Sequence, residues 1–274
     1  GSNFMFVKIG VATVPPATLV ASRLMIGAVI LVAVVRAMGH TFPPLGRAWV
    51  SYAVLAIIGN CLPFWLITTG QKSIDSALAG ILMAIMPLTT LVLAHFFVAG
   101  ETMTRYRAAG FLLGFAGIAV LMGPAALSGL GGSSVEILAQ LCVLAGALCY
   151  ATQSVLVRLM LKGNVMVASA AIIVIAALIS LPVALVVDEP WNLSPSRASV
   201  YTVIWIGIGP TALATFVFLK LIGSAGPTFM SLTNYCIPVV ALLLGLVLLG
   251  EEPGANAYTG LVLILAGIAL SQFS

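Results

Sequence analysis

The chain contains an internal duplication, and this feature limits the possible folds more than any other. Residues 82–120 and 232–270 each hold two apolar runs separated by a short acidic turn. The first run of each copy contains a proline, Pro87 and Pro238, at an offset of 151 residues. Pairs that match at an offset of 150 are Gly100 with Gly250, Glu101 with Glu251, and Gly110 with Gly260. A repeat of this kind predicts two halves with the same internal architecture.

Long apolar runs occupy most of the chain between the turns. Hydrophobic residues make up 62% of the 274 residues and charged residues only 7%, whereas soluble domains carry roughly 25% charged residues. About 20 apolar residues in helical form cross a bilayer. The predicted spans are residues 1–13, 16–35, 50–70, 76–98, 108–122, 135–161, 165–187, 200–222, 227–249 and 257–273. We therefore expect an all-α integral membrane protein with ten transmembrane helices and the lipid bilayer as its surroundings.

The duplication extends to the first span of each half. At the same offset of 150, Lys8 matches Arg158, so the predicted repeats are residues 1–124 and 134–274, with the start of the first helix lying outside the sequence. Each repeat then has five spans. Because five is odd, two copies joined head to tail cross the bilayer in opposite directions. This predicts inverted repeats, an arrangement found in secondary transporters that bind substrate near the midplane.

The basic residues are distributed unevenly over the loops. Arg and Lys accumulate on the cytoplasmic side of membrane proteins, and alternate loops here receive seven cations on one side and at most four on the other. The seven are Arg36, Arg47, Arg105, Arg107, Arg158, Lys162 and Lys220, and the four are Lys8, Arg23, Lys72 and Arg197. Both termini are therefore predicted to be cytoplasmic. Since the cations form no cluster, the net charge of +4 does not indicate a nucleic-acid partner.

These motifs resemble a known family. The paired hairpins with a proline, a Gly-Glu turn and an AGIA sequence, the opening GSNF, and the stretch LTNYCIPVVALLLGLVLLGE are similar to the ten-span, EamA-type branch of the drug/metabolite transporter superfamily. The overall plan is similar to that of YddG-type exporters of aromatic and other neutral amino acids. The resemblance implies a bacterial inner-membrane exporter whose cavity is walled by spans 1, 3, 4, 6, 8 and 9, with spans 5 and 10 outside. The sequence MAIM before Pro87 lacks the polar and aromatic pair that precedes Pro238.

Several polar side chains stand in the middle of predicted spans. Such groups are costly in a bilayer unless they face a cavity or a partner helix. The candidates for substrate binding are Asn3, Asn60, Gln153, Thr211, Thr215 and Asn234. All lie on spans that the resemblance places around the cavity, where they can bond the amino and carboxylate groups of a zwitterion. The alternative is contact between helices, where such bonds are worth about 0.6 kcal/mol on average.

Aromatic residues in the same spans provide candidates for contact with an apolar substrate group. Tyr150, Trp205 and Tyr235 are predicted to bind substrate, together with Trp65 and Phe216 as weaker candidates. Aromatic rings can stack on aromatic or aliphatic groups. The alternative is an interfacial position facing lipid.

Four prolines interrupt the spans and are predicted hinges: Pro63, Pro87, Pro210 and Pro238. Each removes a hydrogen bond inside its helix and favours a kink. In a bilayer the freed carbonyl must find another partner. Because the prolines fall in spans 3, 4, 8 and 9, which correspond pairwise across the repeat, we expect these helices to bend during transport.

The remaining titratable groups indicate little chemistry. Lys8 and Arg158 are candidate contacts for a carboxylate, although both lie near span ends and can instead reach an interface. No carboxylate lies in the centre of a span, and His95 is the only histidine within one. The four cysteines show no ligand spacing, and the glycines of residues 110–117 and 260–267 indicate close helix packing. We expect no metal, no cofactor and no catalytic residue.

The combined prediction is a secondary transporter, not an enzyme, that exports small amphipathic metabolites by alternating access through a midplane cavity. Aromatic and other neutral amino acids are the favoured substrates. A carrier for drugs or nucleotide sugars is the alternative, although sugar nucleotides require several cavity cations. Without an intramembrane carboxylate, facilitated diffusion is favoured over ion coupling. A monomer and an oligomer are both compatible with this prediction.

Overall fold

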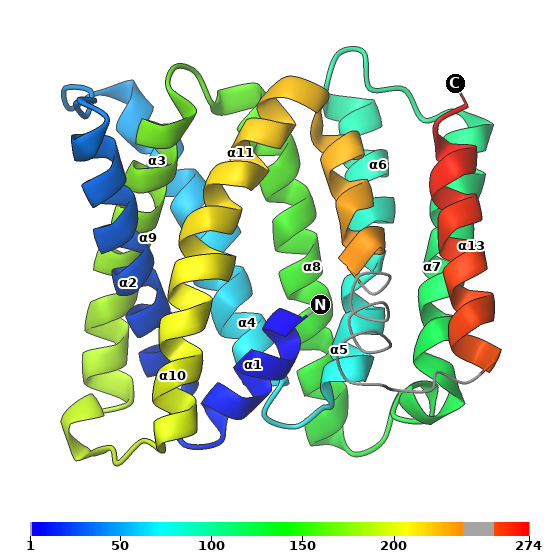
Figure 1. Cartoon of the computed structure of the whole chain (residues 1–274), viewed down its shortest axis with the longest axis horizontal. Helices are drawn as coiled ribbons and strands as arrows, with labels where there is room; N and C mark the ends of the chain where they lie inside the picture. Colours follow the sequence, from blue (N-terminus) through cyan, green and yellow to red (C-terminus); the bar gives the residue numbers. More distant parts are fainter. Residues whose placement is uncertain (1, 238–254, 274) are drawn as a thin grey trace.

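The computed structural model describes residues 2–237 and 255–273, and that part of the chain is helical without a strand (Figure 1). The helices of the first half are α1 (Ser2–Val11), α2 (Pro16–Ala37), α3 (Arg47–Ala56), the π-helical segment η1 (Ile57–Cys61), α4 (Leu62–Gly70), α5 (Ser76–Met83), α6 (Ile85–Phe97) and α7 (Arg105–Leu127). Most run side by side along one direction (Figure 1).

The second half has the same character. Its helices are α8 (Ser134–Met160), α9 (Val165–Val187), the short η2 (Pro190–Asn192), α10 (Arg197–Ile206), the π-helical segment η3 (Gly207–Leu213), α11 (Ala214–Ala225) and α13 (Ala255–Ser271). Residues 227–237 are also helical.

Seven helical segments in the described residues are long and apolar enough to cross a membrane. They are Pro16–Ala37, Arg47–Gly70, Ala77–Phe97, Arg105–Ala125, Ser134–Met160, Val165–Val187 and Arg197–Ala225. Each coincides with one of the predicted spans. The predicted first span appears as the ten-residue α1, and the tenth as the shorter apolar helix Asn256–Ser271. Most of the predicted ninth span, 227–249, lies outside the described residues.

Local sequence signals account for several helix ends. Pro16 occupies the start of α2, where a missing N–H leaves no intrahelical bond unmade. A capping box begins α8, in which Ser133 and Glu136 each accept a hydrogen bond from the other's backbone N–H. The regular part of α7 ends at Gly123, whose φ of 79° is left-handed and which Pro124 follows. This is where the predicted fifth span ends.

The packing separates α7 and α13 from the other helices. These two helices lie together at one edge of the bundle (Figure 1). A Cβ atom added to Gly110 would lie 2.5 Å from the Gly267 carbonyl oxygen, and one added to Gly117 would lie 2.8 Å from the Ile264 nitrogen. Glycine therefore permits the two backbones to touch, which confirms the predicted close packing. At the opposite edge α2 packs on α9, and α8 lies between the two groups.

The predicted prolines lie at or beside interruptions of regular helix. Pro63 follows η1, Pro210 lies inside η3, and Pro87 stands just after the break at Ala84 between α5 and α6. Pro238 lies outside the described residues. The four cysteines are free thiols, as expected of small apolar side chains.

Candidate functional site

A cavity of about 150 Å³ lies between the third, sixth and eighth predicted spans. We call it the central cavity, and its lining residues are Gly59, Asn60, Phe64, Tyr150, Gln153, Pro210, Ala214, Thr215 and Phe218. A water molecule needs roughly 10–15 Å³ of such space, so the cavity has room for a small metabolite. Four of the predicted substrate residues line it, while the described residues of spans 1, 4 and 9 are not among its lining.

Each of two π-helical segments supplies one side of the cavity. They begin at Ile57 and at Gly207, which are related by the same offset of 150 residues that defines the duplication. A π turn is rare and often marks a functional site, because the extra residue widens the helix and redirects side chains. Pro210 has no backbone N–H to donate, and the hydroxyl of the next residue, Thr211, donates to the Ile206 carbonyl at 2.7 Å. The interruption at Pro210 therefore leaves this carbonyl with a hydrogen-bond partner.

Two amides of the cavity wall have no hydrogen-bond partner within the described residues. Asn60 is 3% exposed, and its Nδ2 atom is fully buried without an acceptor. Gln153 is 4% exposed and makes no hydrogen bond with the part of the chain that the structure describes. Its amide lies against the backbone of Gly59, in the space that a Cβ atom there would occupy. An unpaired buried amide costs about 1–3 kcal/mol, so a solute that accepts a hydrogen bond from the Asn60 Nδ2 atom would remove this cost.

Aromatic rings complete the wall. Phe64 and Tyr150 meet edge to face with their centroids 6.4 Å apart. Phe218 and Thr215, both on α11, also line the cavity. The central cavity therefore combines amide groups with apolar faces, a composition typical of small-molecule sites.

Behind this wall lies a buried arginine that the sequence analysis counted among the loop cations. Arg23 is 3% exposed, and its Nε atom donates to the Thr211 hydroxyl at 2.9 Å. The guanidinium carbon lies 3.8 Å from the centroid of the Phe64 ring. Glycines at positions 27 and 207 permit α2 to approach η3 closely. Arg23 therefore stands next to the cavity, one side chain behind its lining.

The charge of Arg23 is only partly compensated. Among the described residues, the one ion pair joins Arg107 to Glu101 at 3.9 Å, and no carboxylate meets Arg23. A cation over an aromatic ring gains about 2 kcal/mol when desolvated, whereas burying an ion costs several kcal/mol. A signal for this residue was present in the sequence, because Arg23 stands inside an apolar run rather than at its end.

Three predicted substrate residues lie away from the central cavity. Tyr235 is fully buried, and its hydroxyl donates to the Phe111 carbonyl of α7 at 2.9 Å. The Asn234 amide contacts the Met86 sulfur at 3.4 Å. Trp205 is 51% exposed and packs beside Phe6. The side chain of Asn3 lies outside what the structure describes.

Lys8 and Arg158 bind backbone carbonyls at helix ends. Lys8 donates to the carbonyl oxygens of Gln71 and Ile74, both at 2.9 Å, just beyond the end of α4. Arg158 donates at 2.8 Å to the Gly223 carbonyl in the last turn of α11. These acceptors are again separated by about 150 residues. Cations stabilise the carbonyl end of a helix, so each residue caps the third span of its own half, in keeping with a position at the interface.

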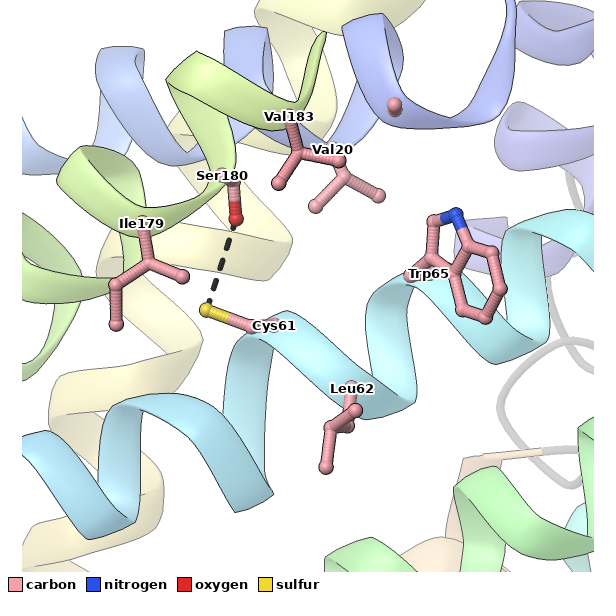
Figure 2. A pocket seen from close by; sticks show the side chains of 8 residues that line it. Val20, Cys61, Leu62, Trp65, Ile179, Ser180 and Val183 are labelled. Atoms are coloured by element: carbon pink, nitrogen blue, oxygen red, sulfur yellow. Dashed lines mark hydrogen bonds between the residues drawn. The ribbon is translucent and has the colours of Figure 1, made fainter. Parts of the chain in front are cut away.

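A second hollow lies on the outer side of η1. This outer groove, of about 210 Å³, is lined by Ala17, Val20, Cys61, Leu62, Trp65, Ile179, Ser180 and Val183. Figure 2 shows Cys61 and Trp65 on the cyan α4 side facing Ser180 and Val183 of α9. The Ser180 hydroxyl approaches the Cys61 sulfur at 3.6 Å. Its lining is almost entirely apolar, and the Trp65 side chain is 47% exposed.

The fold and cavity together define a polytopic membrane protein with a solute-sized polar site inside its helix bundle, and comparison with known proteins identifies its family. The chain matches the EamA-like transporter family over residues 1–123 and 137–273, and it belongs to that family. It is therefore a multi-pass membrane transporter of the drug/metabolite transporter superfamily.

Similar proteins from two bacteria have transporter descriptions. The uncharacterized inner membrane transporter YedA of Escherichia coli is 26% identical over 272 residues, covering 98% of this chain and 86% of that protein. The uncharacterized transporter YoaV of Bacillus subtilis is 23% identical over 275 residues, covering 100% and 93%. A solved crystal structure that is 22% identical superposes with a TM-score of 0.78 over 99% of this chain and 95% of that one. This last likeness concerns the fold alone.

Proposed function

We propose that the protein is a secondary transporter of the bacterial inner membrane that exports small amphipathic metabolites, with aromatic and other neutral amino acids as its substrates. The observation that carries this proposal is the central cavity, where the Asn60 amide, with its unpaired Nδ2 atom, and the Gln153 amide line the same wall as the Phe64 and Tyr150 rings. The amides suit the polar end of such a solute and the rings suit its side chain.

Alternating access between two inverted five-helix repeats, residues 1–124 and 134–274, is the proposed mechanism. It is supported by the two π-helical segments, which begin 150 residues apart and flank the cavity from spans 3 and 8. Irregular helix at membrane depth is tolerated where it lines a cavity, and such discontinuous helices form the sites of many carriers. Bending at Pro63, Pro87, Pro210 and Pro238 would open the cavity to each side in turn, with both termini in the cytoplasm.

Facilitated diffusion is the proposed energetic mode. None of the nine lining residues is acidic. His95 lies near the end of α6, where its Nδ1 atom accepts a hydrogen bond from the Met103 backbone at 3.2 Å. A nucleotide sugar is less well matched, because its phosphates need several cations and Arg23 alone stands beside the cavity in the described residues.

Reconstituted vesicles test this function. Proteoliposomes loaded with labelled phenylalanine, methionine or threonine should release at least one of them faster than protein-free vesicles. Saturable counterflow should accompany the release, because a carrier exchanges its substrate whereas a channel does not. No flux above the protein-free control for any of the three amino acids would end the amino-acid proposal.

A further inference from the structure

We propose that Arg23 is the anchor for the anionic group of the substrate, so that this transporter accepts carboxylates and rejects amines that lack one. The inference rests on the proposed function of the central cavity and names the chemistry that this cavity selects. Arginine carries five N–H donors. In the part of the chain that the structure describes, the Nε hydrogen of Arg23 is the one with an acceptor, the Thr211 hydroxyl at 2.9 Å.

The terminal nitrogens of Arg23 have no hydrogen-bond acceptor among the described residues. The Phe64 face meets the guanidinium at 3.8 Å from its centroid, and a ring face attracts a cation without accepting its hydrogen bonds in the plane. The four N–H groups on the two terminal nitrogens form the fork that binds a carboxylate in bidentate fashion. The protein therefore holds an arginine at 3% exposure whose carboxylate-binding edge has no hydrogen-bond acceptor among the described residues.

The route from the central cavity to this cation is short. Phe64 both lines the cavity and carries the guanidinium on its ring. Thr211, which fixes Nε, is the next residue after Pro210 of the lining. A rotation of the Phe64 ring brings the arginine fork into contact with a solute in the cavity.

The other lining groups give this cation its selectivity. No acidic residue lines the cavity, so a positively charged amine meets Arg23 without a counter-charge. Like charges at close range in a site of low dielectric repel strongly. A carboxylate instead gains the arginine fork, and the unpaired Asn60 amide nitrogen, fully buried in the wall, supplies a further donor. The site therefore favours an anion or a zwitterion over a cation of the same size.

Three probes that share a phenyl ring test this selectivity in proteoliposomes containing the complete chain. Phenylalanine carries both charges, 3-phenylpropionate carries the carboxylate alone, and phenethylamine carries the ammonium alone. We expect phenylalanine and 3-phenylpropionate to exchange and to compete with each other, with half-saturating concentrations within about fivefold. Phenethylamine should compete at least about tenfold more weakly, which corresponds to about 1.4 kcal/mol of lost affinity.

Substitutions of Arg23 test whether this residue causes the preference for carboxylates. Arg23→Gln should abolish the preference for carboxylates, and Arg23→Lys should retain it with weaker binding, because a lysine keeps the charge and loses the fork. The matched control is Arg158→Gln, which removes a cation that caps α11 outside the cavity and should leave the ratio unchanged. If Arg23→Gln does not fold, the probe ratios of the original protein and of Arg23→Lys decide the question.

The outcomes separate this inference from the proposed function. Exchange of phenylalanine with equal competition by phenethylamine overturns the role of Arg23 and leaves the transporter proposal intact. Exchange of 3-phenylpropionate without phenylalanine supports Arg23 and overturns the amino-acid assignment. If none of the three probes exchanges or competes, both proposals are wrong. A folded Arg23→Gln variant with an unchanged carboxylate preference also overturns the inference.

Discussion

The central cavity and the outer groove lie on the two sides of one π-helical segment. Asn60 lines the central cavity and its neighbour Cys61 lines the outer groove. The first hollow contains unpaired amides and lies next to a buried arginine, whereas the second is almost entirely apolar (Figure 2). Consecutive residues of a helix point in different directions around its axis, so a single step along the chain separates the two environments.

This contrast shows that the larger hollow of a membrane protein need not be the better candidate for its substrate site. The outer groove is the larger hollow, at about 210 Å³ against 150 Å³. Its exposed Trp65 and apolar wall suit lipid chains, and lipid offers no reason to retain a polar group. The central cavity keeps polar groups that are costly unless a solute uses them. The chemistry of the wall, rather than its size, therefore supports the central cavity as the proposed substrate site.

The largest expected effect comes from removing one hydroxyl from each region. Thr211→Val deprives the buried Arg23 Nε–H group of its acceptor, so the free energy of unfolding should fall by about 2–3 kcal/mol. Ser180→Ala loses a weak contact to sulfur and should cost less than about 1 kcal/mol. Denaturation of the purified proteins in the same detergent measures both changes. Equal losses of stability in the two variants would contradict the importance of the Thr211 hydroxyl as the acceptor of Arg23.

The second effect concerns two glycines at equivalent places in the π-helical segments. A methyl group at Gly59 enters the space of the Gln153 amide, whereas one at Gly209 meets no atom within 4 Å. Gly59→Ala should therefore lower the transport rate at least about tenfold, since overpacking costs about 1–3 kcal/mol. Gly209→Ala should stay within about twofold of the original protein. Vesicle flux, normalised to the amount of folded protein, is the readout, and similar rates for the two variants would contradict the placement of Gln153.

A smaller effect is expected for the two adjacent residues that face the two hollows. Asn60→Ala removes the unpaired amide and should raise the half-saturating substrate concentration about fivefold, since a hydrogen bond contributes about 0.5–1.5 kcal/mol. Cys61→Ala should change it by less than about twofold. Concentration-dependent counterflow distinguishes the two results. An effect of Cys61→Ala as large as that of Asn60→Ala would place the outer groove on the transport path.

The smallest effect is expected at Trp65, which the sequence analysis treated as a weak aromatic candidate. Because this half-exposed ring lines the outer groove, Trp65→Leu preserves apolar contact with lipid and should alter flux by less than about twofold. Phe64→Leu is the matched variant on the inner side. It removes the ring under Arg23 and should reduce flux several fold more than Trp65→Leu does. A larger loss of flux for Trp65→Leu than for Phe64→Leu would indicate that the outer groove, rather than the central cavity, binds the solute.

The fold could be predicted from the sequence to a large extent because membrane spans follow from composition. Apolar runs broken by short turns correspond to the seven long helices. The glycines of residues 110–117 and 260–267 indicated close helix packing, and the structure shows that this packing joins α7 to α13. The π-helical segments were not predicted. A proline indicates that the regular helix is interrupted. The surrounding packing decides whether the helix kinks, breaks or accommodates an extra residue in a π turn.

The candidate site could be predicted only in part. Asn60 and Gln153 were found because amides in apolar runs are unusual, and the structure brings them together. Tyr235 has the same kind of sequence signal, yet it packs on Phe111 of α7. The face of a span that meets the cavity depends on the rotation of that helix against its neighbours, which an apolar sequence does not reveal. Arg23 was assigned to a loop because counting cations ignores how deep each one lies.

Thiol labelling at two consecutive positions tests the central claim most directly. In a chain without Cys142, Cys149 and Cys236, the native Cys61 is compared with Asn60→Cys in a Cys61→Ala background. We predict that a small water-soluble methanethiosulfonate labels the thiol at position 60 and that phenylalanine slows this reaction. The same reagent should leave Cys61 unmodified, with or without phenylalanine. Protection of Cys61 by phenylalanine, or a thiol at position 60 that the reagent never reaches, would contradict a solute site in the central cavity.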